Sequence, residues 1–216
     1  VSFDVQDFVP ERLAVELATD DPYWQPGQSI EVGVTSRFLY GAPAAGLAGE
    51  AEIKVMVDPD PFPAFPGYRF GRIEERFNDE IDFVDLPVTD ADGETRLLAE
   101  VPAIDPTSLP LRAQLRLSIF EPGGRATQAE TMVPVRTRDV MIGIRPDFDD
   151  GRVRENTAAG FEIVAVDKSG AQIAATDLTY RLLREDFDYQ WFQRNGRWEY
   201  EAIIRDREVG AGTLDA

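Results

Sequence analysis

The stretch from Ile30 to Gly46 reads IEVGVTSRFLYGAPAAG. Its first part, residues 30–36, alternates apolar side chains with polar or small ones, which is the period-two pattern of a half-buried β-strand. Its second part, residues 37–46, turns into glycine, alanine and proline, a composition that ends a strand without making a tight hairpin. We therefore expect a strand that leaves one sheet and re-enters on the other side of a sandwich, where small side chains let two backbones approach closely.

The same alternation recurs along the whole chain, and turn signals separate the alternating segments. Glycine- and proline-rich turns lie at 26–28, 58–63, 90–93 and 121–124, and most of the 15 prolines fall between the alternating segments, which argues against long helices. Many short strands at this spacing predict an all-β, antiparallel fold and not a parallel α/β sheet. The clearest predicted strands are residues 13–18, 30–35, 53–57, 114–119, 140–144, 161–165 and 178–185, followed by an aromatic hairpin formed by 188–193 and 197–204.

The length and the renewed pattern after Thr137 predict two tandem antiparallel β-sandwiches. We place the first domain at residues 1–137 and the second at residues 138–216, with the first few residues as a linker or as the last strand of a preceding domain. The start, VSFDVQDF, lacks an initiator Met and a signal pattern, so we expect a piece of a longer protein. The segment 70–80 has a weak helical pattern and is interpreted as a loop or a short turn.

The charge balance and the missing residue types exclude several functions. The chain carries 40 acidic and 22 basic residues, a formal net charge of −18, which disfavours nucleic acids and anionic membrane surfaces as partners. It contains no Cys and no His, which excludes thiol nucleophiles, disulfides, Cys/His zinc sites and His-based triads within this sequence. We expect no enzyme activity, no cofactor and no catalytic residue.

Two acidic segments are candidate metal sites. The run DFDDG at 147–151 is rich in carboxylates, but it lacks the spaced acidic pattern of a calcium loop. Asp58 and Asp60 are each followed by a proline, which indicates a rigid extended loop more simply than a cation site. We therefore predict no metal ligand.

The richest aromatic group lies near the C-terminal end of the sequence. One interpretation is a contact surface that stacks on a sugar or binds a protein, formed by Tyr189, Trp191, Trp198 and Tyr200. The other is that these side chains, with Phe192, form cross-strand pairs and core within a sheet. The sequence leaves both open.

Several motifs, in their order along the chain, resemble the bacterial alpha-2-macroglobulin family. The family's domain-opening motif is matched by Asp7, Phe8, Pro10, Glu11 and Arg12. Its strand-ending corner is matched by Phe38, Leu39, Tyr40, Gly41, Ala42, Pro43, Ala44, Ala45 and Gly46, with Phe38 where the family often has Tyr. Further similar stretches are FPGYRFG at 65–71, VTDADGETRL at 88–97, IFEPGGRAT at 119–127, IGIRPDF at 142–148, LTYRLLREDFDYQWF at 178–192 and GRWEYE at 196–201.

The resemblance implies two macroglobulin-like domains from the middle of a large periplasmic protein, often an inner-membrane lipoprotein, that traps a broad range of proteases. Cleavage of a bait segment would change the protein's shape, and an internal thioester from a C-x-E-Q motif could then bind the protease covalently. This sequence has no Cys, so the thioester lies outside it. The implied role is a structural scaffold, whose partners are neighbouring domains of the same chain and, through the full-length protein, proteases.

Two other functions stay open from the sequence. One is a tandem Ig-like adhesion or carbohydrate-binding module of a cell-surface protein that uses the aromatic residues at 189–200. The other is an inactive accessory module fused to a hydrolase. A downstream C-x-E-Q motif in the flanking sequence would support the macroglobulin interpretation, and a catalytic domain there would support the accessory module.

Overall fold

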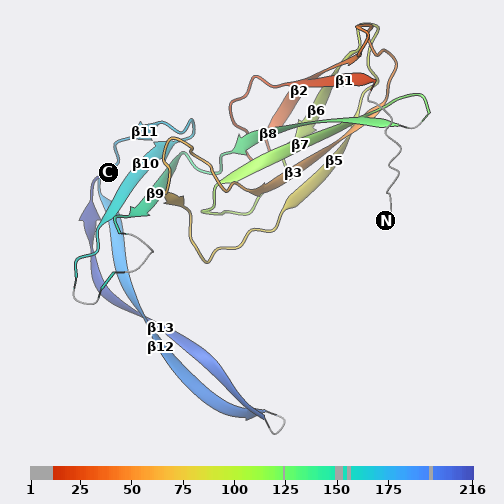
Figure 1. Ribbon diagram of the computed structural model, residues 1–216. Helices are drawn as coiled ribbons and strands as arrows, with labels where there is room; N and C mark the ends of the chain where they lie inside the picture. The colour runs from red at the N-terminus through yellow and green to blue at the C-terminus, as the bar shows by residue number, and fades with distance from the viewer. Residues whose placement is uncertain (1–11, 124, 149–152, 155–156, 195–196) are drawn as a thin grey trace, which may run out of the picture.

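The computed structural model describes residues 12–123, 125–148, 153–154, 157–194 and 197–216. These residues form thirteen strands in four antiparallel sheets and no helix (Figure 1). The strands are β1 Leu13–Ala18, β2 Ser29–Phe38, β3 Gly49–Val57, β4 Arg69–Phe70, β5 Glu80–Leu86, β6 Glu94–Glu100, β7 Leu111–Phe120, β8 Ala126–Val135, β9 Val140–Pro146, β10 Phe161–Asp167, β11 Gln172–Ile173, β12 Leu178–Arg194 and β13 Arg197–Leu214.

Residues 12–136 form a β-sandwich. One sheet has the order β1-β2-β6 and the other has the order β5-β3-β7-β8. Alternate residues of the strands point between the sheets, as the period-two pattern predicts. They form a first core of buried side chains from both sheets, which includes Val32 and Leu97 from one sheet and Ile53, Leu115 and Leu117 from the other.

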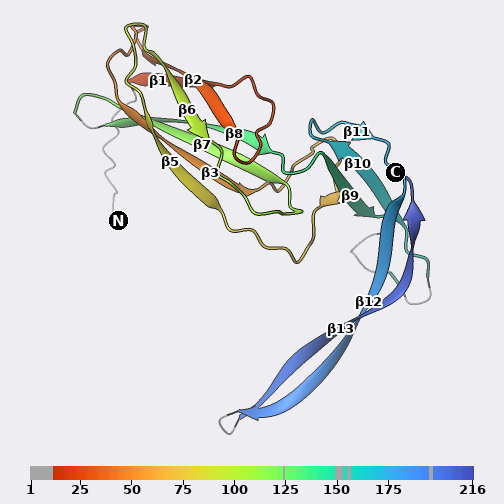
Figure 2. The same ribbon diagram turned by 180° about the vertical axis from the view of Figure 1, so that it is seen from behind.

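A second, smaller sheet has the order β11-β10-β9-β4. Three of its strands follow the sandwich in sequence, but β4 belongs to the long connection between β3 and β5 (Figure 2). We call residues 58–79 the crossing segment. Within it, Arg69 pairs with Ile144 and Phe70 pairs with Gly143, so the crossing segment supplies the edge strand of a sheet that is otherwise built from later residues.

The crossing segment also supplies much of the core of this second sheet. The second core consists of buried Phe62, Phe70, Met141, Val164 and Val166, with Phe65 and Tyr68 packed against it. Four of these seven side chains are aromatic residues of the crossing segment. The second sheet therefore depends on residues that are separated from β9 in sequence by four strands of the sandwich, β5 to β8.

Strands β12 and β13 form a long two-stranded hairpin that extends away from the other sheets (Figures 1 and 2). The sequence suggested a strand ending at residue 185 and a separate hairpin from 188, and this division is wrong. Pairing runs without a break from Leu178–Leu214 to Arg194–Arg197, with one register shift between Leu182 and Leu183. No Gly or Pro interrupts residues 178–194, so nothing ends the strand there.

The all-β antiparallel prediction is confirmed. The interpretation of 70–80 as a loop agrees with the structure except at its edges, where Phe70 belongs to β4 and Glu80 begins β5. The boundary at 137/138 stays a prediction, and the first few residues lie outside the described part of the chain. Nowhere in the described part is there a helix of the length and apolar character that a membrane crossing requires.

Candidate functional site

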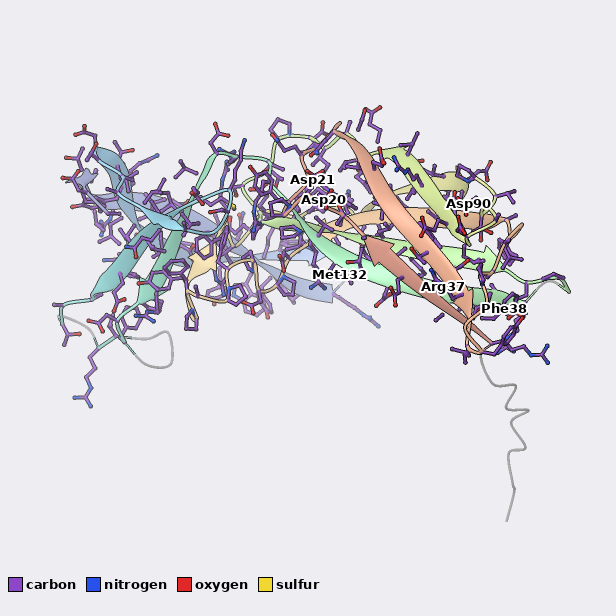
Figure 3. The ribbon with its side chains drawn as sticks, turned by 90° about the horizontal axis from the view of Figure 1, so that it is seen from above. Asp20, Asp21, Arg37, Phe38, Asp90 and Met132 are labelled. Carbon is purple, nitrogen blue, oxygen red and sulfur yellow. The ribbon has the colours of Figure 1, made fainter. Side chains whose placement is uncertain are left out.

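The corner predicted at 38–46 connects the two sheets of the sandwich. β2 ends at Phe38, and β3 begins in the opposite sheet at Gly49. Figure 3 labels Arg37 and Phe38 where the corner begins. Gly41 and Gly46 have φ values of +96° and +73°, which residues with a Cβ rarely adopt.

Hydrogen bonds hold the corner against the loop that precedes β6. The buried Ser36 hydroxyl lies 3.3 Å from the carbonyl oxygens of both Ala44 and Gly93 and shares its single proton between them. The Thr89 hydroxyl donates to the Ala44 carbonyl at 2.7 Å and accepts from the Leu47 N–H at 2.9 Å. Ala44 itself is buried in the first core. The corner is thus a packed connection between the two sheets, and its polar groups form hydrogen bonds within the chain.

The remaining corner side chains divide between packing and exposure. The Phe38 and Tyr40 rings stack at 5.2 Å between centroids. Leu39 and Tyr40 are exposed, as are Pro43 and Ala45, whereas Ala42 is half-buried. The matched motif residues Asp7, Phe8, Pro10 and Glu11 lie outside the described residues; Arg12, which is described, accepts a backbone hydrogen bond from Leu39 at 2.8 Å.

The structure brings Tyr189, Trp191, Trp198 and Tyr200 together on one face of the β12–β13 hairpin. Trp191 pairs directly with Tyr200, and their ring centroids lie 5.3 Å apart; the Tyr189 and Tyr200 rings lie 6.0 Å apart. The four side chains are 62–68% exposed. Trp191 and Tyr200 form a cross-strand pair, as one interpretation proposed, but the four side chains are not core of the described residues.

The crossing segment is fastened to the second sheet by a polar cluster. The Tyr68 hydroxyl donates to Glu162 at 2.8 Å, and the Arg145 guanidinium pairs with the same carboxylate, donates to the Pro66 carbonyl at 3.3 Å and lies 4.7 Å from the Tyr68 ring centroid. The hydrogen bonds from Tyr68 and Arg145 lower the pKa of Glu162, and the bond to Glu162 raises the pKa of Tyr68. The carboxylate therefore stays ionised and holds both partners.

Arg136 joins the sandwich, the crossing segment and the β10–β11 turn. Its side chain is 5% exposed, its Nε donates to the Lys168 carbonyl at 3.0 Å, and its Nη2 donates to the Pro61 carbonyl at 3.4 Å. Its guanidinium lies 4.6 Å from the Phe62 ring centroid. Burial lowers the pKa of Arg136, and the nearby Asp58 acts in the opposite direction. A buried guanidinium at this point fixes the three segments relative to one another.

Glu75 ties the far end of the crossing segment back to the sandwich. Its carboxylate accepts from the Thr107 hydroxyl at 2.5 Å, from the Ser108 N–H at 3.0 Å and from the Ser108 hydroxyl. These bonds, first of all the one from the Ser108 hydroxyl, lower the pKa of Glu75 to about 2. The crossing segment is therefore anchored at both ends.

The acidic segments show no metal geometry in the described residues. Asp58 accepts from the Asp60 N–H at 3.2 Å and lies 3.9 Å from Arg112 Nη1, the arrangement of an Asx turn next to a cation. No group of three or more Asp or Glu residues gathers in the described part of the chain in a way that could hold a metal ion. Of the run 147–151, residues 149–151 lie outside the described residues.

Sequence reasoning missed the crossing segment, Arg136 and Glu75. A signal was present, because four aromatic residues lie from position 62 to position 70, a stretch in which no strand was predicted. A solvated loop has no reason to carry so many large apolar rings. The partners of these rings lie far away in sequence, and the pattern alone did not identify them.

Comparison with known proteins agrees with this architecture. The family model described as the bacterial alpha-2-macroglobulin MG5 domain matches residues 11–136, and that of bacterial macroglobulin domain 6 matches residues 143–216. Alpha-2-macroglobulin of Escherichia coli (strain K12) is 30% identical over 229 residues, covering 99% of this chain, and that of Xylella fastidiosa (strain Temecula1) is 29% identical over 216 residues, covering 98%. The chain spans 14% and 13% of the length of these two curated relatives.

Solved structures of such proteins share the fold. The native conformation of E. coli alpha-2-macroglobulin, determined by cryo-EM, matches with a TM-score of 0.72 at 29% identity over 99% of this chain and 14% of that chain. Salmonella alpha-2-macroglobulin reacted with methylamine matches with a TM-score of 0.72 at 30% identity over 97% of this chain and 15% of that chain. The chain therefore belongs to the bacterial alpha-2-macroglobulin family, of which it carries an MG5 domain followed by a domain 6 region.

Proposed function

We propose that this chain is a scaffold region of a bacterial protease trap, and that it acts by keeping two neighbouring domains in a fixed relation while the full-length protein changes shape. It performs no catalysis itself. The parent protein would be a broad-spectrum inhibitor in the periplasm, held at the inner membrane as a lipoprotein. Its partners would be adjacent domains of the same polypeptide and the attacking proteases.

The single observation that carries the scaffold role is the crossing segment. It is continuous with the sandwich, it supplies β4 and four aromatic side chains to the second sheet, and it is fastened at its ends by Arg136 and Glu75. Two domains joined only by a linker move independently, whereas two domains that share a core move together. The region is thus suited to transmit a displacement from one end to the other.

The relatives support the link to proteases. One solved E. coli alpha-2-macroglobulin is described as activated by porcine elastase, and this chain matches it with a TM-score of 0.69 at 27% identity over 97% of this chain and 20% of that chain. Family membership favours this function over an adhesion or sugar-binding module.

The test uses the full-length protein and elastase. A trap that encloses its target should block digestion of a large protein substrate and leave cleavage of a small peptide substrate nearly unchanged. A variant with Phe62→Ala and Phe70→Ala, which loosens the crossing segment, should be cut by elastase at the same rate and yet block much less digestion. Gly33→Ala, within the sandwich, is the matched control and should behave as the parent protein does. A loosened variant that traps as well as the parent protein would refute the scaffold role, and digestion of the large substrate at full rate by the unmodified protein would refute the trap.

A further inference from the structure

The outer half of the β12–β13 hairpin has one apolar face and one charged face. Residues that pair across two strands share a face, as do residues two positions apart along a strand. Trp191 and Tyr200 pair, and Tyr189 and Trp198 lie two positions away on the same side. We call these four side chains, each more than 60% exposed, the aromatic face.

The opposite face of the same ribbon is mainly charged and polar and also carries Phe192 and Ile203. It carries the ion pairs Arg184–Asp186 at 2.6 Å and Arg205–Asp188 at 3.4 Å, and it continues through Gln190 paired with Glu201. This division between two faces is the pattern of a sheet with one side buried and the other solvated. The aromatic face is thus an exposed apolar patch of the kind that marks an interaction site.

The described residues offer no cover for this face. The hairpin forms a separate two-stranded sheet and extends away from both the sandwich and the second sheet (Figures 1 and 2). An isolated two-stranded hairpin is marginally stable in water and needs further packing. The aromatic face therefore requires an occupant from elsewhere.

Charge and chain length select the occupant. Each chain carries a formal net charge of −18, so a second copy meets strong like-charge repulsion, as would nucleic acid or an anionic membrane. This chain spans only 13% and 14% of the length of the two curated relatives given above. Such a family member therefore has many other domains beside this region. Packing within one polypeptide also has the advantage of a high effective concentration.

We propose that the aromatic face is an interdomain docking surface, covered in the full-length polypeptide by an apolar sheet face of a domain outside residues 1–216. Sheets packed face to face bury alternate side chains of both partners. The aromatic face consists of such alternate side chains, so it can make this kind of contact. This proposal rests on family membership and does not require the protease trap.

Hydroxyl-radical footprinting of the full-length protein, read by mass spectrometry at Trp191 and Trp198, tests the proposal. In the monomer without protease, both indoles should be oxidised at least fivefold more slowly than a free tryptophan peptide. Oxidation at the rate of the free peptide overturns the proposal. Slow oxidation only at concentrations where sedimentation velocity detects dimers overturns it in favour of a second copy, and slow oxidation only after protease is added overturns it in favour of the protease.

A matched pair of variants gives an independent readout. Trp191→Ser with Tyr200→Ser removes one cross-strand pair of the aromatic face, and Gln190→Ser with Glu201→Ser removes the adjacent pair of the opposite face. In the full-length protein, the first variant should speed amide hydrogen exchange of the hairpin at least tenfold and the second should change it less than twofold. Equal effects of the two variants would overturn the proposal, and footprinting of the unmodified protein decides the question if the first variant does not fold.

Discussion

Gly143→Ala should destabilise the protein through a single ring, that of Phe70. A Cβ built on Gly143 lies 2.6 Å from Cζ and 2.7 Å from Cε1 of Phe70, and 3.0 Å from Cγ1 of Val164. Ordinary contact begins at 3.4 Å, so the ring would have to withdraw by about 0.8 Å from a site in which Phe70 is 6% exposed. Overpacking of this kind costs about 1–3 kcal/mol.

The backbone at this position has the opposite effect on the free energy of unfolding. Gly143 is a strand residue without a positive φ, so alanine by itself should stabilise by about 0.5–1 kcal/mol through the unfolded chain. Gly33→Ala in β2 is the control for this effect, because its Cβ would meet Ala18 only at 3.7 and 3.9 Å. We therefore expect Gly33→Ala to stabilise and Gly143→Ala to destabilise.

Replacing the Phe70 ring with a smaller side chain tests whether the ring causes the destabilisation. Phe70→Leu alone should cost about 1–2 kcal/mol by leaving space in the second core. Combined with Gly143→Ala it should cost at least about 1 kcal/mol less than the two single changes added together, since the methyl fills that space. Urea unfolding of the four proteins, followed by circular dichroism, gives the free energies. If the two costs add within about 0.5 kcal/mol, the contact between β4 and β9 does not cause the destabilisation.

Three further predictions concern other parts of the fold. Glu75→Gln should lower the free energy of unfolding at pH 7 by about 1.5 kcal/mol, because it weakens hydrogen bonds to a charged group. The pKa of Glu75 is lowered from 4.5 to about 2 in the folded protein, so its contribution to the free energy of unfolding is present above pH 4.5 and is lost toward pH 2. Urea titrations of the two proteins should therefore converge in acid. A difference that stays constant with pH would contradict this assignment. Gly93→Ala should destabilise by more than about 3 kcal/mol in thermal unfolding, because its Cβ would lie 2.3 Å from the Ser36 carbonyl oxygen at a φ of +79°, whereas Gly41→Ala, in open space at +96°, should cost about 1 kcal/mol; equal costs would argue against a tightly packed corner. Residues 138–216 expressed alone should show no cooperative thermal transition by calorimetry, and residues 58–216, which lack β1, β2 and β3 of the sandwich, should not restore it; a sharp transition for 138–216 would support two independent domains.

The sequence predicted strands in which apolar residues alternate regularly with polar or small ones. In β2, for example, Ile30, Val32 and Val34 alternate with polar or small residues and all three are buried in the first core. The corner was also predictable, since its glycines and alanines specify backbone freedom and close approach by their own chemistry.

The crossing segment was not predictable in the same way. β4 contains only Arg69 and Phe70, too few residues for a period, and its pairing with Gly143 and Ile144 is set by the fold of a later part of the chain. Likewise, arginine is mostly a surface residue, so the sequence gives no sign that Arg136 is buried. It is buried because Pro61, Phe62 and Lys168, which are distant from it in sequence, pack around it. Local patterns specify strands, and long-range contacts decide how the strands are shared.

The crossing segment also limits how this region can be recombined with other proteins. A chimaera that fused residues 138–216 to a foreign upstream domain would inherit a sheet without its outermost strand and without the rings of Phe62, Phe65, Tyr68 and Phe70 that fill its underside. A successful transplant would have to carry residues 58–79 along with their recipient sheet, so a portable module that contains this sheet cannot begin at a boundary drawn at 137.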